Sequence, residues 1–170
     1  FVLIDRFYPR IKTDYVISDS QGGAKTAVEY LLSQGHQKIG CVTSSPHLKT
    51  VQLRVEGYKD ALRNRGVPMK KRFIKNVPVP DKHQEIKVAL RDLLYPPNSV
   101  TSIFTIAYTL TLYVLAALKN MNLRIPYDFS LVSFDDGDIL EYSSIPAIRQ
   151  PIGRMGEQAE IGRASCRERV

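Results

Sequence analysis

The sequence predicts an α/β fold in which a parallel sheet is covered by helices on both faces. Two observations support this prediction. Short continuous apolar runs, of the length of buried strands, alternate with longer segments whose apolar residues recur at helical spacing. The repeated order of strand and helix also favours parallel strands joined by right-handed helical crossovers.

Local patterns justify each element in the first half of the chain. From the N-terminus we expect a buried strand at residues 1–5, a strand at 15–19, a helix at 20–35, a buried strand at 38–44 and a second helix at 51–66. The first helix has Asp19 or Ser20 as its N-cap and Gly35 at its end, because short polar residues cap helix starts and glycine favours helix ends. The second helix ends at Gly66 and has an apolar stripe of Val51, Val55, Tyr58 and Leu62.

The second half continues the alternation. We expect a strand at 72–79, a helix at 81–94, a strand at 101–106, a helix at 109–122 and a strand at 130–134. Asp81 and Gln84 form a capping-box pattern at the start of the helix at 81–94, and Pro96 and Pro97 follow its end. The residues before 18 and after 147 lie outside the regular alternation.

Composition places the chain among folded globular proteins. It has 170 residues, 44% of them hydrophobic, and a formal net charge of +7, so disorder is not expected. No apolar run approaches the ~18 residues of a membrane span. Cys41 sits in the apolar run IGCV, where we expect a buried strand residue and no disulfide framework.

The last ten residues, IGRASCRERV, match the translation of a common sequencing adaptor in one reading frame. We expect residues 161–170 not to belong to the natural protein, and such segments must be left out of fold reasoning. They contain Cys166, three arginines and one glutamate. Without them the net charge falls by two and one cysteine remains.

Two carboxylates follow the last predicted strand. Asp135 and Asp136 come directly after the apolar run at 130–134. In an open parallel sheet, ligands bind just beyond the carboxyl ends of the strands, where these carboxylates would accept hydrogen bonds from ligand hydroxyls or amines. Capping of the next turn is an equally good interpretation of such a pair.

Sequence motifs of enzymes and metal sites are absent. The sequence has no HExxH, GxSxG, P-loop or GxGxxG pattern, and Gly22 and Gly23 lack the spacing of a phosphate cradle. The three histidines, His36, His47 and His83, are far apart and show no paired ligand spacing. We therefore expect no catalytic residues, no metal site and no cofactor.

Five segments of the chain carry a family resemblance. They are VLIDR (2–6), VISDSQGGAKTAVEYLLSQGHQKIG (16–40), LRVEGYKDAL (53–62), LRIPYDFSLVSFDD (123–136) and IRQPIGRMGEQA (148–159). In this order and spacing they resemble the effector-binding domain of the LacI/GalR family of bacterial transcription regulators. Each segment is weak evidence alone, whereas the ordered set is specific.

The resemblance implies a periplasmic-binding-protein-like fold of type I, with two α/β lobes joined by crossing segments. Residues 1–17 would be a remnant of the DNA-proximal lobe, 18–147 the nearly complete DNA-distal effector-binding lobe, and 148–160 the crossover and the helix that return to the first lobe. It also implies a cytoplasmic homodimer without a membrane span. Such a regulator binds a small sugar-like effector between its lobes and operator DNA through an N-terminal helix-turn-helix, which these residues do not include.

The resemblance also assigns candidate ligand-binding residues. Arg54, in LRVEGY, matches the family arginine that clamps a ligand hydroxyl or carboxylate. Asp135 matches the family's ligand-contacting aspartate after the last strand. Asp5 and Arg6 end the first strand and face the cleft in the family pattern, where an inter-lobe salt bridge and a ligand contact are both open. Thr50 adds a candidate hydroxyl.

One departure from the family pattern concerns Ala107 and Tyr108. The family commonly has Asn-Asp after the strand at 101–106, with the Asn on the ligand and the Asp capping the next helix. Tyr108 instead brings a ring that can stack on a sugar or base face, or fill the pocket as core. Asp136 is expected to be structural. The departure leaves the identity of the ligand open.

Two other functions remain as alternatives to a regulator, which we expect to be a repressor. A secreted sugar-binding protein of an ABC transporter has the same fold and cleft, and an enzyme on a flavodoxin-like sheet shares the architecture. The segment IRQPIGRMGE and the unpaired Cys41 favour the regulator over the transport protein. The lack of a nucleophile–base pair in the sequence disfavours an enzyme.

Overall fold

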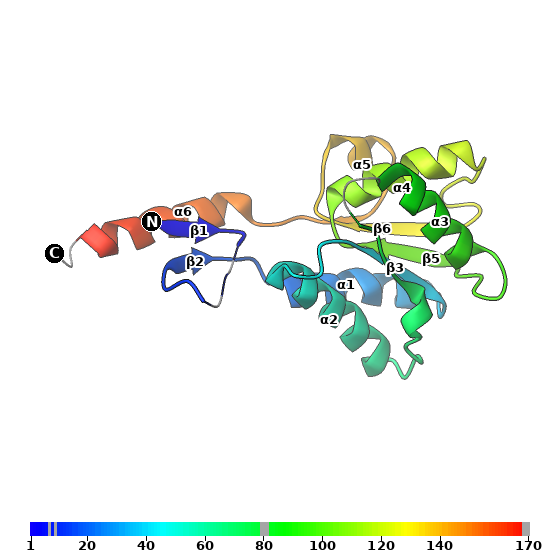
Figure 1. Ribbon diagram of the computed structural model, residues 1–170, viewed down its shortest axis with the longest axis horizontal. Coiled ribbons are helices and arrows are strands. Elements are labelled where there is room, and N and C mark those ends of the chain that lie inside the picture. The colour runs from blue at the N-terminus through cyan, green and yellow to red at the C-terminus, as the bar shows by residue number, and fades with distance from the viewer. Residues whose placement is uncertain (7, 9, 79–81, 168–170) are drawn as a thin grey trace.

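Five short strands form one parallel sheet in the computed structural model, which describes residues 1–6, 8, 10–78 and 82–167 (Figure 1). The strands lie in the order β4-β3-β5-β6-β7. Their bounds are Ile39–Thr43 for β3, Ile74–Asn76 for β4, Ser102–Thr105 for β5, Ser130–Phe134 for β6 and Ala147–Ile148 for β7. Every neighbouring pair is parallel, so the predicted architecture is confirmed.

Helices cover both faces of this sheet (Figure 1). One face carries α1 (Ser20–Ser33) and α2 (Lys49–Asn64), and the other carries α3 (Lys82–Leu94) and α4 (Tyr108–Asn120). The Asp19 side chain caps α1 by accepting a hydrogen bond from the Gly22 amide at 2.8 Å. Gly35 follows α1 with a φ of 88°, a conformation that glycine adopts without strain. Both predicted ends of this helix are confirmed.

The core lies between the sheet and the two helical layers. Fully buried side chains from the central strands, such as Cys41 and Phe104, pack against helical side chains such as Tyr58 and Leu110. The Tyr58 hydroxyl donates a hydrogen bond to the Ile39 carbonyl oxygen at 2.8 Å, which satisfies its polar atom inside the core. The predicted burial of Cys41 is confirmed, since its thiol is free and inaccessible.

A smaller lobe holds the first two strands and the last helix of the chain (Figure 1). It consists of a two-stranded parallel sheet, β1 (Val2–Ile4) and β2 (Asp14–Val16), with α6 (Ile152–Arg167) alongside. Two segments, residues 17–19 and 149–151, cross between the lobes. No helix in the described part of the chain is long and apolar enough to cross a membrane.

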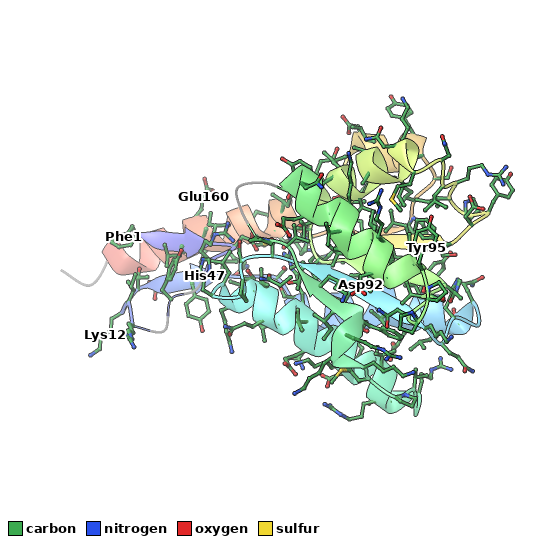
Figure 2. All side chains as sticks on the ribbon, turned by 45° about the vertical axis from the view of Figure 1, so that its right-hand side comes forward. Phe1, Lys12, His47, Asp92, Tyr95 and Glu160 are labelled. Atoms are coloured by element: carbon green, nitrogen blue, oxygen red, sulfur yellow. The ribbon has the colours of Figure 1, made fainter. Side chains whose placement is uncertain are left out.

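The small lobe departs from the predicted strands. The strand expected to be buried at 1–5 is largely open: the exposed fraction is 86% for Phe1, which lies at the open end of this lobe in Figure 2, and 49% for Ile4. The prediction of burial was wrong because, among the described residues, β1 lies mainly against one strand, β2, and one helix, α6. The second strand ends at Val16, since the chain there leaves for the large lobe.

Two further differences concern the large lobe. Residues Lys71–Phe73 form a short 3₁₀ helix, so the strand expected at 72–79 is reduced to β4, and Phe73 turns into the core with 4% exposure. The helix α5 (Asp138–Tyr142) was not expected, because five residues are too few to show a helical period. The Asp81 half of the expected capping box lies outside the described residues.

Candidate functional site

Arg54 and Asp135 meet at the carboxyl end of the sheet. The Arg54 Nη1 atom lies 3.1 Å from Asp135 Oδ2 and donates a second hydrogen bond to the Ile106 carbonyl oxygen at 2.8 Å. The Arg54 guanidinium also covers the ring of Phe134, with its Cζ atom 3.9 Å from the ring centroid. Arg54 is only 5% exposed, so these contacts fix a buried cation against the ends of β5 and β6.

The apolar face of α2 determines where Arg54 points. Val51, Tyr58 and Leu62 bury this face against the sheet, and Arg54 shares it because it lies three residues after Val51 and four before Tyr58. Thr50 lies one turn earlier on the same helix and is 4% exposed. The structure therefore brings the candidate residues Thr50 and Arg54 onto one buried helical face.

Both carboxylate oxygens of Asp135 have protein partners. Oδ2 faces Arg54, and Oδ1 accepts a hydrogen bond from Gln150 Nε2. The Ser18 hydroxyl in turn donates to Gln150 Oε1 at 2.5 Å. Ser18 and Gln150 lie in the two crossing segments, so a continuous chain of hydrogen bonds joins Asp135 to both connections between the lobes.

Asp5 and Arg6 approach this pair from the small lobe. Asp5 follows β1 with a φ of 54°, and Asp135 follows β6 with a φ of 70°. Aspartate is one of the few residues that enter this left-handed region, and such positions cluster at functional sites. Arg6 Nη1 lies 4.0 Å from Asp5 Oδ2. The two small-lobe residues thus form a loose ion pair where the crossing segments begin.

The charges of the two lobes act on one another. Burial lowers the pKa of Arg54, and the carboxylates of Asp135 and Asp5 oppose that effect, while the Arg6 charge adds to it. Burial raises the pKa of Asp135; Arg54 and the hydrogen bond from Gln150 oppose that change. Four of the predicted site residues, two from each lobe, therefore share one electrostatic environment.

Two buried polar atoms in this region have no hydrogen-bond partner among the described residues. They are Arg54 Nε, which is a donor, and Asp5 Oδ1, which is an acceptor. Native proteins leave few buried polar atoms unpaired, and each such atom calls for an explanation. A hydroxyl group, which both donates and accepts, is the kind of partner that each of the two atoms lacks.

Tyr108 takes a different position from the charged residues. It is the first residue of α4, and its half-buried ring lies against the loop after β6: a Cβ added at Gly137 would lie 2.5 Å from Tyr108 Cε2. Ala107 occupies the N-cap of α4 and gives it no side-chain hydrogen bond. The ring packing supports a structural role for Tyr108.

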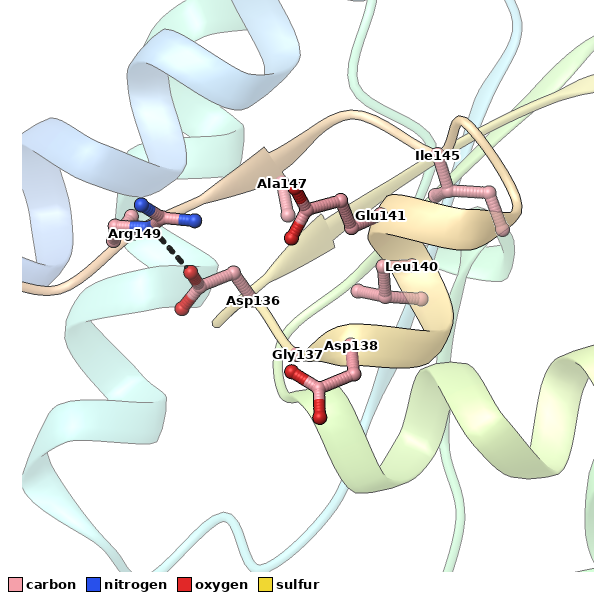
Figure 3. Close-up of a pocket in the computed structure, with 8 residues that line it drawn as sticks. All are labelled: Asp136, Gly137, Asp138, Leu140, Glu141, Ile145, Ala147 and Arg149. Carbon is pink, nitrogen blue, oxygen red and sulfur yellow. Dashed lines mark hydrogen bonds and ion pairs between the residues drawn. The ribbon is translucent and has the colours of Figure 1, made fainter.

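Two hollows adjoin the site. One of about 360 Å³ is shown in Figure 3, and its lining comprises Asp136, Gly137, Asp138, Leu140, Glu141, Ile145, Ala147 and Arg149. The dashed line in Figure 3 joins Asp136 to Arg149, an ion pair that agrees with the structural role expected for Asp136. The second hollow, of about 580 Å³, lies between α6 and the large lobe and is lined in part by Gln150. Gln150 therefore connects this inter-lobe hollow to Asp135.

Sequence reasoning missed three residues that support Asp135. Gln150 and Ser18 reach it through hydrogen bonds from the crossing segments, and Ser133 Oγ donates to its backbone carbonyl oxygen at 2.9 Å. Gln150 and Ser18 lie inside the segments that carry the family resemblance, but a single sequence does not show which polar residues meet across 132 positions. A serine inside the apolar run SLVSF was a visible sign of a buried polar contact.

Comparison with known proteins identifies the class of protein that has this fold. The chain belongs to the family of periplasmic binding protein-like domains, whose profile matches residues 28–160. Its relatives are LacI-family transcriptional regulators. The repressor CytR of Escherichia coli is 29% identical over 162 residues, covering 94% of this chain and 47% of CytR. The regulator GalS of Salmonella typhimurium is 32% identical over 160 residues, covering 93% of this chain and 46% of GalS.

Solved structures agree with this assignment. A LacI family transcriptional regulator from Enterococcus faecium with bound ribose superposes with a TM-score of 0.78 at 27% identity, covering 94% of this chain and 59% of that chain. The chain spans about half the length of the curated relatives it matches. These relatives are transcriptional regulators rather than enzymes, and they do not favour the alternative of a transport protein.

Proposed function

We propose that this chain is the effector-sensing domain of a bacterial DNA-binding transcriptional regulator, and that the regulator is a repressor. The effector is a small sugar or sugar derivative, bound where the two lobes meet. One observation carries the proposal: Asp5 and Arg6 of the small lobe share an electrostatic environment with Arg54 and Asp135 of the large lobe. Ligand contacts drawn from both lobes are what a lobe-closing sensor requires.

The chemistry of the site favours a polyhydroxylated ligand. The charges of Arg54 and Asp135 offset each other, as do those of Asp5 and Arg6, so the site has no net charge to hold an anion. Arg54 Nε and Asp5 Oδ1 offer a free donor and a free acceptor. Vicinal hydroxyls, which donate and accept, match this arrangement, and the related regulator from Enterococcus faecium holds ribose.

The proposed mechanism is a shift between lobe arrangements. A ligand that contacts both lobes stabilises the arrangement in which all its contacts form, and it acts only by its difference in affinity for the two states. In a homodimer, that shift alters the spacing of two helix-turn-helix heads and hence their fit to two operator half-sites. In this proposal the heads belong to a part of the regulator that the chain does not span, since it covers about half the length of its HTH-type relatives.

The proposal is tested by measuring effector binding to the full-length regulator at a pH typical of the cytoplasm. We would measure thermal shifts and operator affinity with pentoses, hexoses, disaccharides, nucleosides and sugar phosphates. The variant Arg54→Met should lose the shift given by the active compound. Its matched control is Arg63→Met on the same helix, whose side chain is 70% exposed and pairs only locally with Asp60. If no compound changes operator affinity, or if both variants respond alike, the proposal is wrong.

A further inference from the structure

The last two residues of β6 anchor Asp135 from opposite faces of the sheet. Successive side chains of a strand point to opposite faces. Phe134 faces α2 and lies under the Arg54 guanidinium. Ser133 faces α4 and lies 2.7 Å from the Thr111 hydroxyl. The residue that follows, Asp135, is thus held by contacts to both helical layers.

On the α4 side, three buried hydroxyls form a chain. Thr105 Oγ1 on β5 lies 2.6 Å from Thr111 Oγ1 on α4, which lies 2.7 Å from Ser133 Oγ on β6. All three residues are 0% exposed. Ser133 Oγ then reaches the Asp135 carbonyl oxygen at 2.9 Å and the Phe134 carbonyl oxygen at 3.1 Å. The chain therefore ends on the backbone of the candidate ligand-binding carboxylate.

Proton counting gives this chain a direction. Each hydroxyl has one proton to donate, and the two short oxygen–oxygen contacts use two of the three protons. Four backbone carbonyl oxygens compete for the third proton: Asp135 at 2.9 Å and Phe134 at 3.1 Å from Ser133, Ala107 at 3.2 Å from Thr111, and Val132 at 3.4 Å from Thr105. The shortest of these contacts, to Asp135, is the best hydrogen bond. Donation therefore runs from Thr105 through Thr111 and Ser133 to Asp135.

We propose that Ser133 is a positioning residue for effector binding: its hydroxyl, oriented by Thr111 and Thr105, holds Asp135 in the left-handed conformation that directs the carboxylate to Arg54 and Gln150. The inference rests on the proposed function, because Asp135 matters as a ligand contact only there. Its physical basis is that a left-handed backbone is unfavourable for an L-residue and persists where its surroundings fix it. A fully satisfied buried network supplies that fixation.

The test compares Ser133→Ala with Ser102→Ala in the full chain. Ser102 is a matched control because it is also a fully buried serine, on the adjacent strand β5, and its hydroxyl has no partner among the described residues. The Asp135 carboxyl is followed by NMR titration of protein labelled with ¹³C-aspartate, with its signal assigned by its loss in Asp135→Asn. This measurement needs no ligand, and it reports on the Asp135 carboxyl rather than on the stability of the folded chain.

In Ser133→Ala we expect the Asp135 carboxyl to swing toward solvent and its pKa, which burial raises in the native chain, to fall toward the ordinary value of 3.8. Ser102→Ala should leave the titration unchanged, and Ser133→Thr should restore it. An unchanged Asp135 titration in Ser133→Ala overturns the inference. Failure of the proposed function would be seen in a separate measurement. In that case no metabolite would change the operator affinity of the wild-type regulator.

Discussion

Gly57 of α2 lies against the backbone of α1 so closely that an added Cβ would collide with the Gln21 carbonyl oxygen and come 2.9 Å from Ala24 Cβ. The helices meet here one turn after Arg54, so the contact sets the depth at which the guanidinium reaches the sheet. Because the colliding atom belongs to the backbone, it cannot move aside by a rotamer change. We expect Gly57→Ala to lower the free energy of unfolding by about 1–3 kcal/mol, measured by urea denaturation.

Gly153→Ala is the control for this substitution. Gly153 lies in α6, and an added Cβ there meets nothing within 4 Å. Alanine should leave stability unchanged or raise it by up to about 1 kcal/mol, since it restricts the unfolded chain. Equal losses in the two variants would show that the Gly57 contact is not specific.

The Arg54–Asp135 pair should show strong energetic coupling. Removing one partner leaves a largely buried charge unpaired, which costs more than removing both. In a cycle of Arg54→Met, Asp135→Asn and the double variant, we expect a coupling of about 0.5–3 kcal/mol in urea denaturation. Lys25 and Glu29, an exposed ion pair 3.7 Å apart on α1, provide the reference cycle, which should give about 0.5 kcal/mol or less. A coupling no larger than this reference would contradict the buried geometry.

The Tyr108 ring should make Gly137 intolerant of a side chain. An added Cβ at Gly137 would lie 2.5 Å from Tyr108 Cε2, so Gly137→Ala should cost about 1–3 kcal/mol of unfolding free energy. The φ of Gly137 is 176°, an extended value that alanine adopts freely, so the cost must come from the ring. In a Tyr108→Asn background, Gly137→Ala should therefore be nearly neutral. A cost that persists without the ring would refute this explanation.

His36 should make stability depend on pH. Burial lowers the pKa of His36 from its ordinary 6.5, and its ring nitrogens lie 2.9 Å from the Thr101 hydroxyl and 3.0 Å from the Ser130 hydroxyl. Because the unfolded state then binds the proton more readily than the folded state, stability falls as the pH drops below about 6.5. We expect the urea midpoint to fall between pH 7.5 and 5.5, and to fall less in His36→Asn. His47→Asn should retain the wild-type slope.

Sequence patterns predicted the large lobe well because its elements are regular. Strand β6 has the same bounds in sequence and structure, and the ends of α1 follow from Asp19 and Gly35, whose local chemistry is sufficient to fix a helix terminus. The small lobe was harder to predict. The apolar run at 1–5 has the composition of a buried strand, but burial depends on what covers it, and that is a property of the assembled lobe.

The candidate site also has residues that could be predicted from the sequence and residues that only the structure reveals. Arg54 and Asp135 were predicted from the family resemblance, and the structure brings them together although 81 positions separate them. Gln150, Ser18 and Ser133 were not predicted, since their roles arise only when the crossing segments and α4 reach the same strand end. Their side chains are ordinary for loops and strands. Only the folded topology brings Ser18 and Gln150 to this carboxylate, whereas Ser133 is near Asp135 in the sequence and its link to α4 is what the fold adds.

On the proposed function, the hydrogen bond from Gln150 gives the Asp135 carboxylate two roles, as a contact to the ligand and as a contact to a segment that crosses between the lobes. In the proposed mechanism, a sugar hydroxyl that hydrogen-bonds to Asp135 Oδ1 must share this oxygen with the Gln150 amide or displace that amide. Gln150 belongs to one of the two segments that cross between the lobes. Ligand binding at Asp135 and release of this crossing segment would then be coupled through one exchange of hydrogen bonds. On the proposed function, a change of ligand at Asp135 would therefore also alter the contact to the crossing segment, so that recognition and response would change together.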